Sequence, residues 1–235
     1  MFGQQLVNGL MLGSVYALIA IGYTLVFGVL RMLNLAHAYF FMVTPFIALA
    51  LLGVGVPALA ALGLSLMCAA AIGLLLYFTA FRPIPPDRHL AGFVSSLSFG
   101  VILQVVVANV FGTLPKPFAT GVAWPDFEFG SLILSGVQVL SLGVAAVLMA
   151  ALFYAIKKTR FGRNVRAIAE NERAASLLGV KVRRSVIAVF FISSVLAGLA
   201  GLMVALRFES IDAVRSGLAG VQYLADDGIS GVVYL

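Results

Sequence analysis

Long stretches without a charged residue dominate this sequence and limit what it can fold into. Five of them contain no Asp, Glu, Lys or Arg: Met1–Leu30, Met32–Phe81, His89–Pro115, Phe129–Ile156 and Ser185–Leu206. A helix needs about 20 apolar residues to cross the hydrocarbon core of a bilayer, and every stretch is long enough. The chain is therefore predicted to be an integral membrane protein.

The stretches are continuously apolar, whereas strands of a membrane β-barrel would alternate polar and apolar residues over about 10 positions. Helices are therefore expected. The second stretch, of 50 residues, is too long for one crossing, and turn-forming residues interrupt it between Gly53 and Pro57. The predicted fold is an all-α polytopic bundle of six spans. Composition agrees, because only 10% of the residues are charged, against roughly 25% in soluble domains.

The basic residues predict which end of the bundle faces the cytoplasm. Nine of the 15 Lys and Arg lie in residues 157–184, and loops rich in Lys and Arg remain in the cytoplasm. Alternating the spans from this loop places three more basic residues inside and three outside. The inner ones are Arg31, Arg82 and Arg88, and the outer ones are Lys116, Arg207 and Arg215. The N-terminus is then predicted to face outward.

The spans define one transmembrane domain at residues 1–206, which includes the basic loop at 157–184. Residues 207–235 contain no charge-free run long enough to cross a bilayer, so they are expected to form an extracytoplasmic tail. Trp124, in the predicted external loop, is interpreted as an interfacial anchor. The net charge of +6 is concentrated in one loop, which favours membrane lipid over nucleic acid as its partner.

The acidic residues bear on how transport would be energised. Proton- and sodium-driven carriers commonly place ionisable residues inside their spans, and the apparent spans here contain no Asp or Glu. This pattern favours a pore-forming subunit energised by another protein over a self-powered carrier. A sodium site built from carbonyl and hydroxyl groups stays open.

A few polar residues interrupt the apolar stretches and form the candidate solute path: Asn8, Ser14, Asn34, His37 and Gln104. Asn34 and His37, three residues apart between the first two spans, could share a helical face and line a path or cap a broken helix. Alternatively, they belong to a boundary loop that meets water. Gln104 could contact a solute or hydrogen-bond across helices.

Small residues at roughly four-residue spacing predict close contact between helices. Gly9, Gly13 and Ala17 form such a ridge in the first span, and Ser194, Gly198 and Gly201 form another in the last. Both ridges are interpreted as helix-packing positions and not as binding sites. Cys68, the single cysteine, lies inside a span and is also expected to be packed.

The basic loop is predicted to hold two short helices, at residues 163–170 and 172–178, with Gly179 as a C-terminal cap. The second helix carries small and apolar side chains outside the bilayer: Ala174, Ala175, Leu177 and Leu178. Basic residues beside a membrane most often meet anionic lipid. Exposed apolar faces, however, usually dock onto something, so a cytoplasmic protein partner is also expected.

No arrangement of residues in the sequence predicts a catalytic, metal-binding or nucleotide-binding site. There is no His, Cys or carboxylate cluster with metal-ligand spacing, no G-x-x-x-x-G-K-[ST] loop, and no nucleophile paired with a base. The chain is therefore predicted not to be an enzyme, and to need no metal and no cofactor of its own.

Several motifs carry a family resemblance. Residues 173–179 read Arg-Ala-Ala-Ser-Leu-Leu-Gly, which resembles the Glu-Ala-Ala, three residues, Gly coupling motif of ATP-binding-cassette importer permeases, with Arg173 in place of the Glu. Other segments are similar to branched-chain amino-acid permeases of the LivH family: residues 8–18, Asn34-Leu35-Ala36-His37, Phe81-Arg82-Pro83 and residues 159–163. The resemblance covers roughly residues 1–207.

This resemblance implies a permease subunit that imports branched-chain or other small amino acids across a bacterial inner membrane. It implies as partners a second permease subunit, two cytoplasmic ATPase subunits that bind the ATP, and an extracytoplasmic solute-binding protein. The ATPase-coupling residues would be Arg166, Arg173, Ala174, Ala175, Leu177, Leu178 and Gly179. Permeases for urea or short amides, a non-transporting membrane scaffold and a secondary carrier are the alternatives.

The sequence departs from the family pattern in two places. The family usually has Gly and Glu after the His of the Asn-Leu-Ala-His segment, whereas this chain has Ala38 and Tyr39. Family members also continue with further glycine-rich membrane helices, where this chain has the charged residues of its tail. A truncation, a frameshift or a divergent short form would each explain the second departure.

Overall fold

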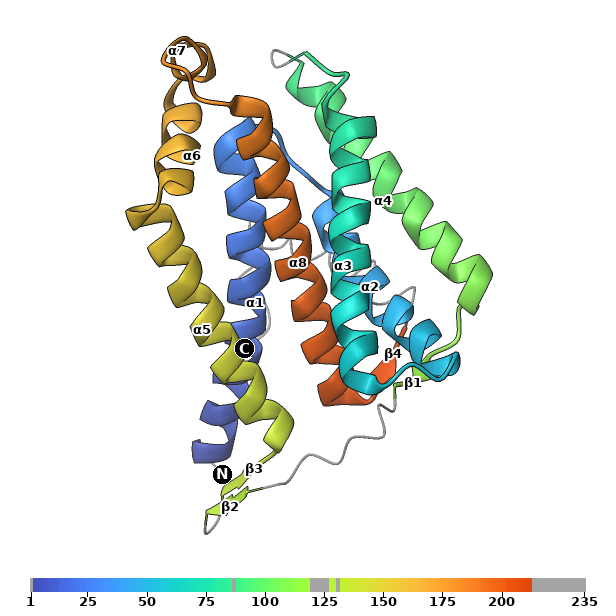
Figure 1. The fold of residues 1–235 in the computed structure, drawn as a ribbon. Helices are drawn as coiled ribbons and strands as arrows, with labels where there is room; N and C mark the ends of the chain where they lie inside the picture. The colour runs from blue at the N-terminus through green and yellow to red at the C-terminus, as the bar shows by residue number, and fades with distance from the viewer. Residues whose placement is uncertain (1, 86–87, 119–126, 130–131, 213–235) are drawn as a thin grey trace.

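The computed structural model describes residues 2–85, 88–118, 127–129 and 132–212, most of which are helical. Among them, six helices are long and apolar enough to cross a membrane (Figure 1). They are α1 (Phe2–Leu30), α2 (Ala36–Gly53), α3 (Ala58–Leu76), α4 (His89–Phe111), α5 (Gly136–Lys158) and α8 (Val182–Phe208). The predicted all-α bundle of six spans is confirmed.

The long apolar stretch divides into α2 and α3 at the predicted turn. Gly55 has a φ of +87°, a conformation that glycine adopts without the clash of a Cβ atom, and Pro57 directly precedes α3. At its far end α3 continues into a π-helical turn, Tyr77–Phe81, in which the Arg82 N–H donates to the Tyr77 carbonyl at 2.8 Å. Hydropathy did not predict this π-helical turn.

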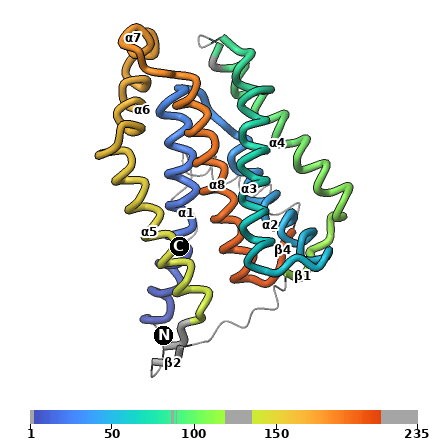
Figure 2. Tube along the Cα trace, in the orientation of Figure 1, coloured from blue at the N-terminus to red at the C-terminus, as the bar shows by residue number. Residues whose placement is uncertain are grey.

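α8 lies at the centre of the bundle, between α1 and α3 (Figure 2), and is the most buried of the six spans. Its predicted small-residue ridge lies against α2 and α3. A Cβ atom on Gly198 would come within 2.6 Å of Thr44 Oγ1, and one on Gly201 would overlap the Phe41 carbonyl. Glycine at these positions therefore lets α2 approach α8 closely.

The other predicted ridge packs differently. At Gly9 and Gly13, no atom of the described chain lies within 4 Å of the place that a Cβ would take. The packing predicted for these two glycines therefore has no partner helix among the described residues, and it stays a prediction. Cys68 is exposed on α3, so its predicted packing is not found among the described residues.

Short strands join the loops at one end of the bundle. β1 (Lys116–Pro117) pairs antiparallel with β4 (Ser210–Ile211), and β2 (Phe127–Phe129) pairs with β3 (Leu132–Leu134). α8 runs two residues past the predicted boundary, and Glu209 then turns the chain in a left-handed conformation. The boundary at 206 stays a prediction. Trp124 and Arg215 lie outside the residues that the structure describes.

The basic loop lies at the opposite end from β1 and β4, as Figure 1 shows by the positions of α7 and β1. It forms α6 (Arg160–Glu170) and α7 (Glu172–Leu177). α6 begins three residues earlier than predicted because Thr159 caps it: the Thr159 hydroxyl oxygen accepts from the Gly162 N–H at 3.3 Å.

Labelling of single cysteines tests which end is cytoplasmic. Because Cys68 is exposed, it is first replaced by Ala, and then Arg166→Cys and Lys116→Cys are made separately. A membrane-impermeant maleimide added to intact cells should label the Lys116 position and not the Arg166 position, since loops rich in Lys and Arg stay inside. Labelling of the Arg166 position from outside would reverse the predicted orientation.

Candidate functional site

The connection between α1 and α2 is a non-helical segment, residues 31–35, that returns into the bundle. His37, in the first turn of α2, contacts the middle of α1: a Cβ on Gly22 would lie 3.0 Å from His37 Cε1. Gly22 lies eight residues before the end of α1, about 12 Å along the helix axis. Non-helical backbone at membrane depth is tolerated where protein buries it. We call residues 31–35 the α1–α2 joint.

A buried set of hydrogen-bonding side chains surrounds this joint. We call it the polar cluster: Asn34, His37, Ser96 and Ser193, each at most 2% exposed. His37 Nδ1 is 3.0 Å from Ser193 Oγ on α8, and His37 Nε2 is 3.1 Å from the Ile19 carbonyl on α1. The carbonyl can only accept, so Nε2 carries a proton and donates to it. The imidazole thus joins three spans through its two nitrogens.

The joint is also held by α4. The Leu35 N–H donates to Ser96 Oγ at 3.2 Å, and the His37 N–H donates to the Asn34 carbonyl at 3.2 Å. The side-chain oxygen of Asn34 is buried and has no hydrogen-bond partner among the described residues. Buried polar atoms are nearly always paired. The Asn34 side-chain oxygen is an exception, since it is a buried acceptor at membrane depth that receives no hydrogen bond from the described residues.

Tyr39, which stands where the resembling family has Glu, is used for packing. Its side chain is 4% exposed, and a Cβ on Gly100 of α4 would overlap its ring. The departure at this position therefore adds an aromatic contact between α2 and α4 beside the polar cluster.

The five candidate solute-path residues do not share one place. Asn34 and His37 lie together in the polar cluster. Near the N-terminal end of α1, Asn8 Oδ1 accepts from Gln138 Nε2 at 2.8 Å. The Ser14 hydroxyl donates to the Met11 carbonyl in its own helix at 2.7 Å, and Gln104 is half-buried in α4. The structure thus brings two of the five together.

Side chains hold α6 and α7 at a sharp turn. Asn171, which separates the two helices, caps α7 through its Oδ1, which accepts from the Ala174 N–H at 3.0 Å. Gly179, with a φ of +84°, ends α7 in the left-handed conformation that the sequence predicts for a C-terminal glycine. We call residues 160–179 the α6–α7 segment.

The apolar residues of α7 divide between two faces. Ala175 is 2% exposed and packs into the core cluster that contains Val165 and Val186, whereas Leu177 and Leu178 are 88% and 84% exposed. Ala174 and Arg173 are exposed, and Arg166 on α6 donates to the Ile156 carbonyl. The exposed apolar face predicted for α7 therefore consists mainly of the two leucines.

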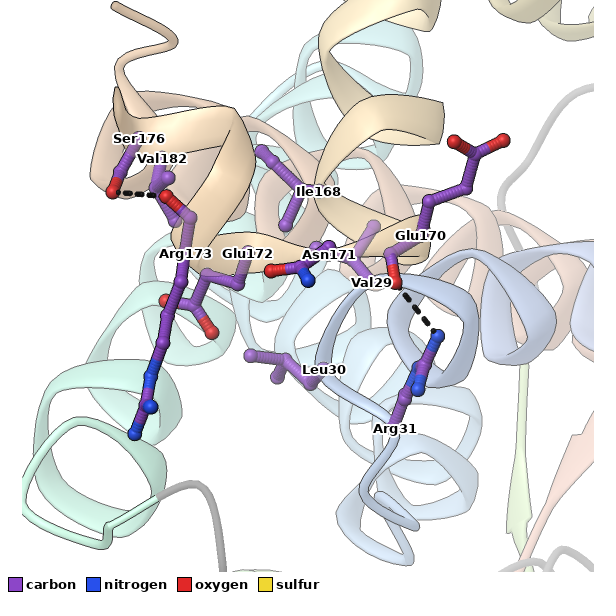
Figure 3. A pocket seen from close by; sticks show the side chains of 10 residues that line it. All are labelled: Val29, Leu30, Arg31, Ile168, Glu170, Asn171, Glu172, Arg173, Ser176 and Val182. Carbon is purple, nitrogen blue, oxygen red and sulfur yellow. Dashed lines mark hydrogen bonds between the residues drawn. The ribbon is translucent and has the colours of Figure 1, made fainter. Parts of the chain in front are cut away.

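A cavity of about 860 Å³ opens between the end of α1 and the α6–α7 turn (Figure 3). Arg31 lies at one side of it and donates through Nη2 to the carbonyls of Ala169 and Glu170, at 2.6 and 3.2 Å. Figure 3 shows the Glu170 carboxylate pointing away from that bond. The cavity is also lined by Leu30, Ile168, Asn171, Glu172, Arg173, Ser176 and others.

Three residues that make these hydrogen bonds are not among the site residues predicted from the sequence: Ser193, Gln138 and Arg31. Position in the last span and polarity could have pointed to Ser193, but the partners of Gln138 and Arg31 are 130 and 138 residues away in sequence. Among the described residues, no group of three or more His, Cys, Asp and Glu could hold a metal ion.

Comparison with known proteins places the chain among transport proteins. Residues 5–232 match the family described as branched-chain amino acid transport system / permease component. The match continues past residue 207, where the resemblance by motifs ended.

Similar proteins include permeases for amino acids and for sugars. BraD of Pseudomonas aeruginosa, a high-affinity branched-chain amino acid transport system permease protein, is 32% identical over 97% of this chain and 79% of its own. LivH of Escherichia coli, with the same description, is 31% identical over 98% of this chain and 79% of its own. The ribose import permease protein RbsC of Haemophilus influenzae is 32% identical over 50% of this chain and 36% of its own. No solved structure matches the chain significantly.

Proposed function

Because this chain belongs to the permease components of branched-chain amino acid transport systems, a family of multi-pass membrane transport proteins and not of enzymes, we propose that it imports branched-chain or other small amino acids. In this proposal it resides in a bacterial inner membrane and pairs with a second permease subunit. Two cytoplasmic ATPase subunits energise the pair, and an extracytoplasmic protein delivers the solute.

The two exposed leucines of α7 carry this proposal. Leu177 ends α7, Leu178 follows it as the C-cap, and both lie outside the six spans, whereas Ala175 packs into the core. Leucine side chains that are 88% and 84% exposed at the end of a folded helix favour a docked protein. The ATPase subunit is the partner that the family resemblance implies at the α6–α7 end of the bundle, so we assign the two leucines to its docking surface.

The α6–α7 segment is well placed to pass motion to the membrane. α6 follows α5 after one residue, Thr159, and α7 precedes α8 with four residues between them. A displacement of the docked segment would therefore move two spans directly. α8 packs against α1, α2 and α3 at the centre of the bundle, so its movement would rearrange the pathway in an alternating-access cycle.

The polar cluster supports a solute path near the α1–α2 joint. The Asn34 side-chain carbonyl is an acceptor without a partner among the described residues, and an acceptor of this kind suits the ammonium group of an amino acid. We propose that Asn34 and His37 line the path, and that Ser193 holds the imidazole in place. The relatives that cover nearly the whole chain transport branched-chain amino acids according to their names, which favours that class of solute.

The energy source of uptake tests the proposal. Cells that express the chain with its partner subunits should accumulate radiolabelled leucine. Depletion of ATP should abolish the uptake, whereas an uncoupler that leaves cellular ATP intact should change it little, since the spans offer no acidic residue for a proton. Excess urea should not compete.

The opposite outcomes identify the alternatives. Uptake that survives ATP depletion but collapses with the uncoupler would show a secondary carrier. Uptake of radiolabelled urea without uptake of leucine would show an amide importer, and an assembled complex without any uptake would show a scaffold.

A further inference from the structure

Arg31 connects two parts of the chain that are far apart in sequence. It follows the last residue of α1, where its N–H donates to the Phe27 carbonyl at 2.8 Å and its φ is +52°. Residues other than glycine rarely adopt this left-handed conformation. The backbone therefore leaves the helix at Arg31 and enters the α1–α2 joint, while the side chain is free to reach the α6–α7 segment.

The side chain of Arg31 caps the end of α6. Nη2 donates to the Ala169 carbonyl at 2.6 Å and to the Glu170 carbonyl at 3.2 Å, as Figure 3 shows for the second bond. The last carbonyls of a helix lack partners within the helix and carry partial negative charge. A guanidinium suits this position because it is always charged and offers several donors in one plane.

The bond falls at the hinge between the two short helices. α6 ends at Glu170, and Asn171 begins the capping of α7. Arg31 thus holds the turn itself, and not one helix alone. In the other direction, Asn34 lies three residues further along the chain, and His37 hydrogen-bonds the Asn34 carbonyl. Only five residues, 32–36, therefore separate Arg31, which caps α6, from His37 of the polar cluster.

The covalent chain does not provide this connection. The α6–α7 segment is continuous with α5 and α8, and α8 contacts the polar cluster through Ser193. The other helices around the joint, α1, α2 and α4, lie elsewhere in sequence. Motion of the segment would pull α5 and α8 directly, while the joint would follow only through non-covalent contacts. Val29 and Ile168 belong to one apolar core cluster in this region, but apolar packing is non-directional, whereas hydrogen bonds are directional.

We propose that Arg31 is a positioning residue for transport: it ties the α6–α7 turn to the α1–α2 joint, so that movement of the segment also moves Asn34 and His37. This inference rests on the proposed function. It assigns to Arg31 no contact with the solute or with the ATPase. Its loss should therefore separate ATP hydrolysis from solute movement without separating the subunits.

The test uses the complete transporter, with its ATPase subunits and binding protein, in proteoliposomes. Arg31→Ala and Arg31→Gln both remove the charged donor, and Gln keeps part of the side-chain stem if the Ala variant does not accumulate. Both should lower leucine transport by about tenfold or more, the loss expected for one charge-assisted hydrogen bond. The amount of co-purified ATPase should stay unchanged, so the number of ATP molecules hydrolysed per leucine should rise. Arg31→Lys, which keeps the charge, should recover part of the transport.

Arg184→Ala provides the matched control, because Arg184 is an exposed arginine at the start of α8 at the same end of the bundle. It should leave the ratio of hydrolysis to transport unchanged. Normal transport by both Arg31→Ala and Arg31→Gln would overturn the inference, and so would a loss that only parallels lost ATPase binding. If the unaltered transporter fails to move leucine with ATP, the proposed function itself fails, which is a separate outcome.

Discussion

Replacing Leu177 and Leu178 together by Asp is expected to remove the ATPase subunits from the complex while the membrane domain stays folded. Both side chains project from α7 with 88% and 84% of their surface exposed, so their loss costs the isolated chain little. Burying a leucine at an interface contributes about 1.5–3 kcal/mol. Losing two should weaken ATPase binding at least a hundredfold, since about 1.4 kcal/mol is a factor of ten. Co-purification of a tagged ATPase measures this.

Two further variants make the result specific. Leu177→Met with Leu178→Met keeps an apolar surface of similar volume and should retain ATPase binding. Leu90, 82% exposed at the same end of the bundle, provides the matched leucine outside the α6–α7 segment. Leu90→Asp falls in the first turn of α4, where a negative charge suits the helix dipole, and should also retain binding. ATPase bound normally by the double Asp variant would contradict the assignment of this face.

The structure shows that Ala175, close to the two leucines, is a poor position for testing ATPase docking. Ala175 belongs to the motif that suggested coupling, but it is buried in the core cluster with Val165 and Val186. Ala175→Asp would therefore disturb the packing of α7 on its own bundle, because a buried carboxylate without a partner is costly. A loss of ATPase binding in that variant would not separate docking from folding, whereas the two leucines do separate them.

The second large effect is expected at Gly201, which we expect to be required for folding. A Cβ at this position would overlap the main-chain carbonyl of Phe41, so the backbone of α2 or α8 must move to accept a side chain. Overpacking of this kind costs about 3 kcal/mol. Gly201→Val should therefore lower both the yield of monodisperse protein and its unfolding temperature in detergent.

Gly143→Val is the control for this variant. Gly143 also lies in a span, α5, but no described atom is within 4 Å of its Cβ position. It should tolerate Val with little change in unfolding temperature, because no neighbour has to move. A Gly201→Val protein as stable as the Gly143→Val protein would show that α2 and α8 do not pack as closely as the structure places them.

The sequence was sufficient to predict the spans because a bilayer imposes one length and one polarity on every crossing helix. The turn at Gly55 and the cap at Gly179 were also predictable, since both need a left-handed backbone that glycine adopts without strain. These features depend on local sequence alone.

Features that depend on which helix packs against a residue could not be predicted from local sequence. The ridges of Gly9 and Gly201 have similar small-residue spacing, but at Gly9 no described atom lies within 4 Å of a Cβ, whereas at Gly201 a Cβ would overlap the Phe41 carbonyl. The spacing of small residues indicates that another helix can approach closely, but it does not indicate which helix does so. The same limit applies to Ala175 and Leu177, because adjacent residues of one helix face different ways and only the tertiary packing decides which is buried.

The polar cluster needed the three-dimensional structure for a related reason. Asn34 and His37 were recognised from their polarity in an apolar stretch, whereas Ser193 lies 156 residues from His37 and resembles any serine of a membrane helix. Polarity marks residues 31–37 as unusual but does not predict that residues 31–35 return into the bundle. That return accompanies the close packing of α2 against α8, which Gly198 and Gly201 allow.

The most direct test of the account is the rate of ATP hydrolysis by the complete transporter in proteoliposomes, measured with and without binding protein loaded with leucine. We expect leucine-loaded binding protein to stimulate hydrolysis and to accompany leucine transport, and the Leu177→Asp, Leu178→Asp variant to show neither. A hydrolysis rate that does not respond to loaded binding protein, in a complex whose ATPase and permease subunits are fully assembled, would contradict the claim that this chain is the conducting subunit of an importer.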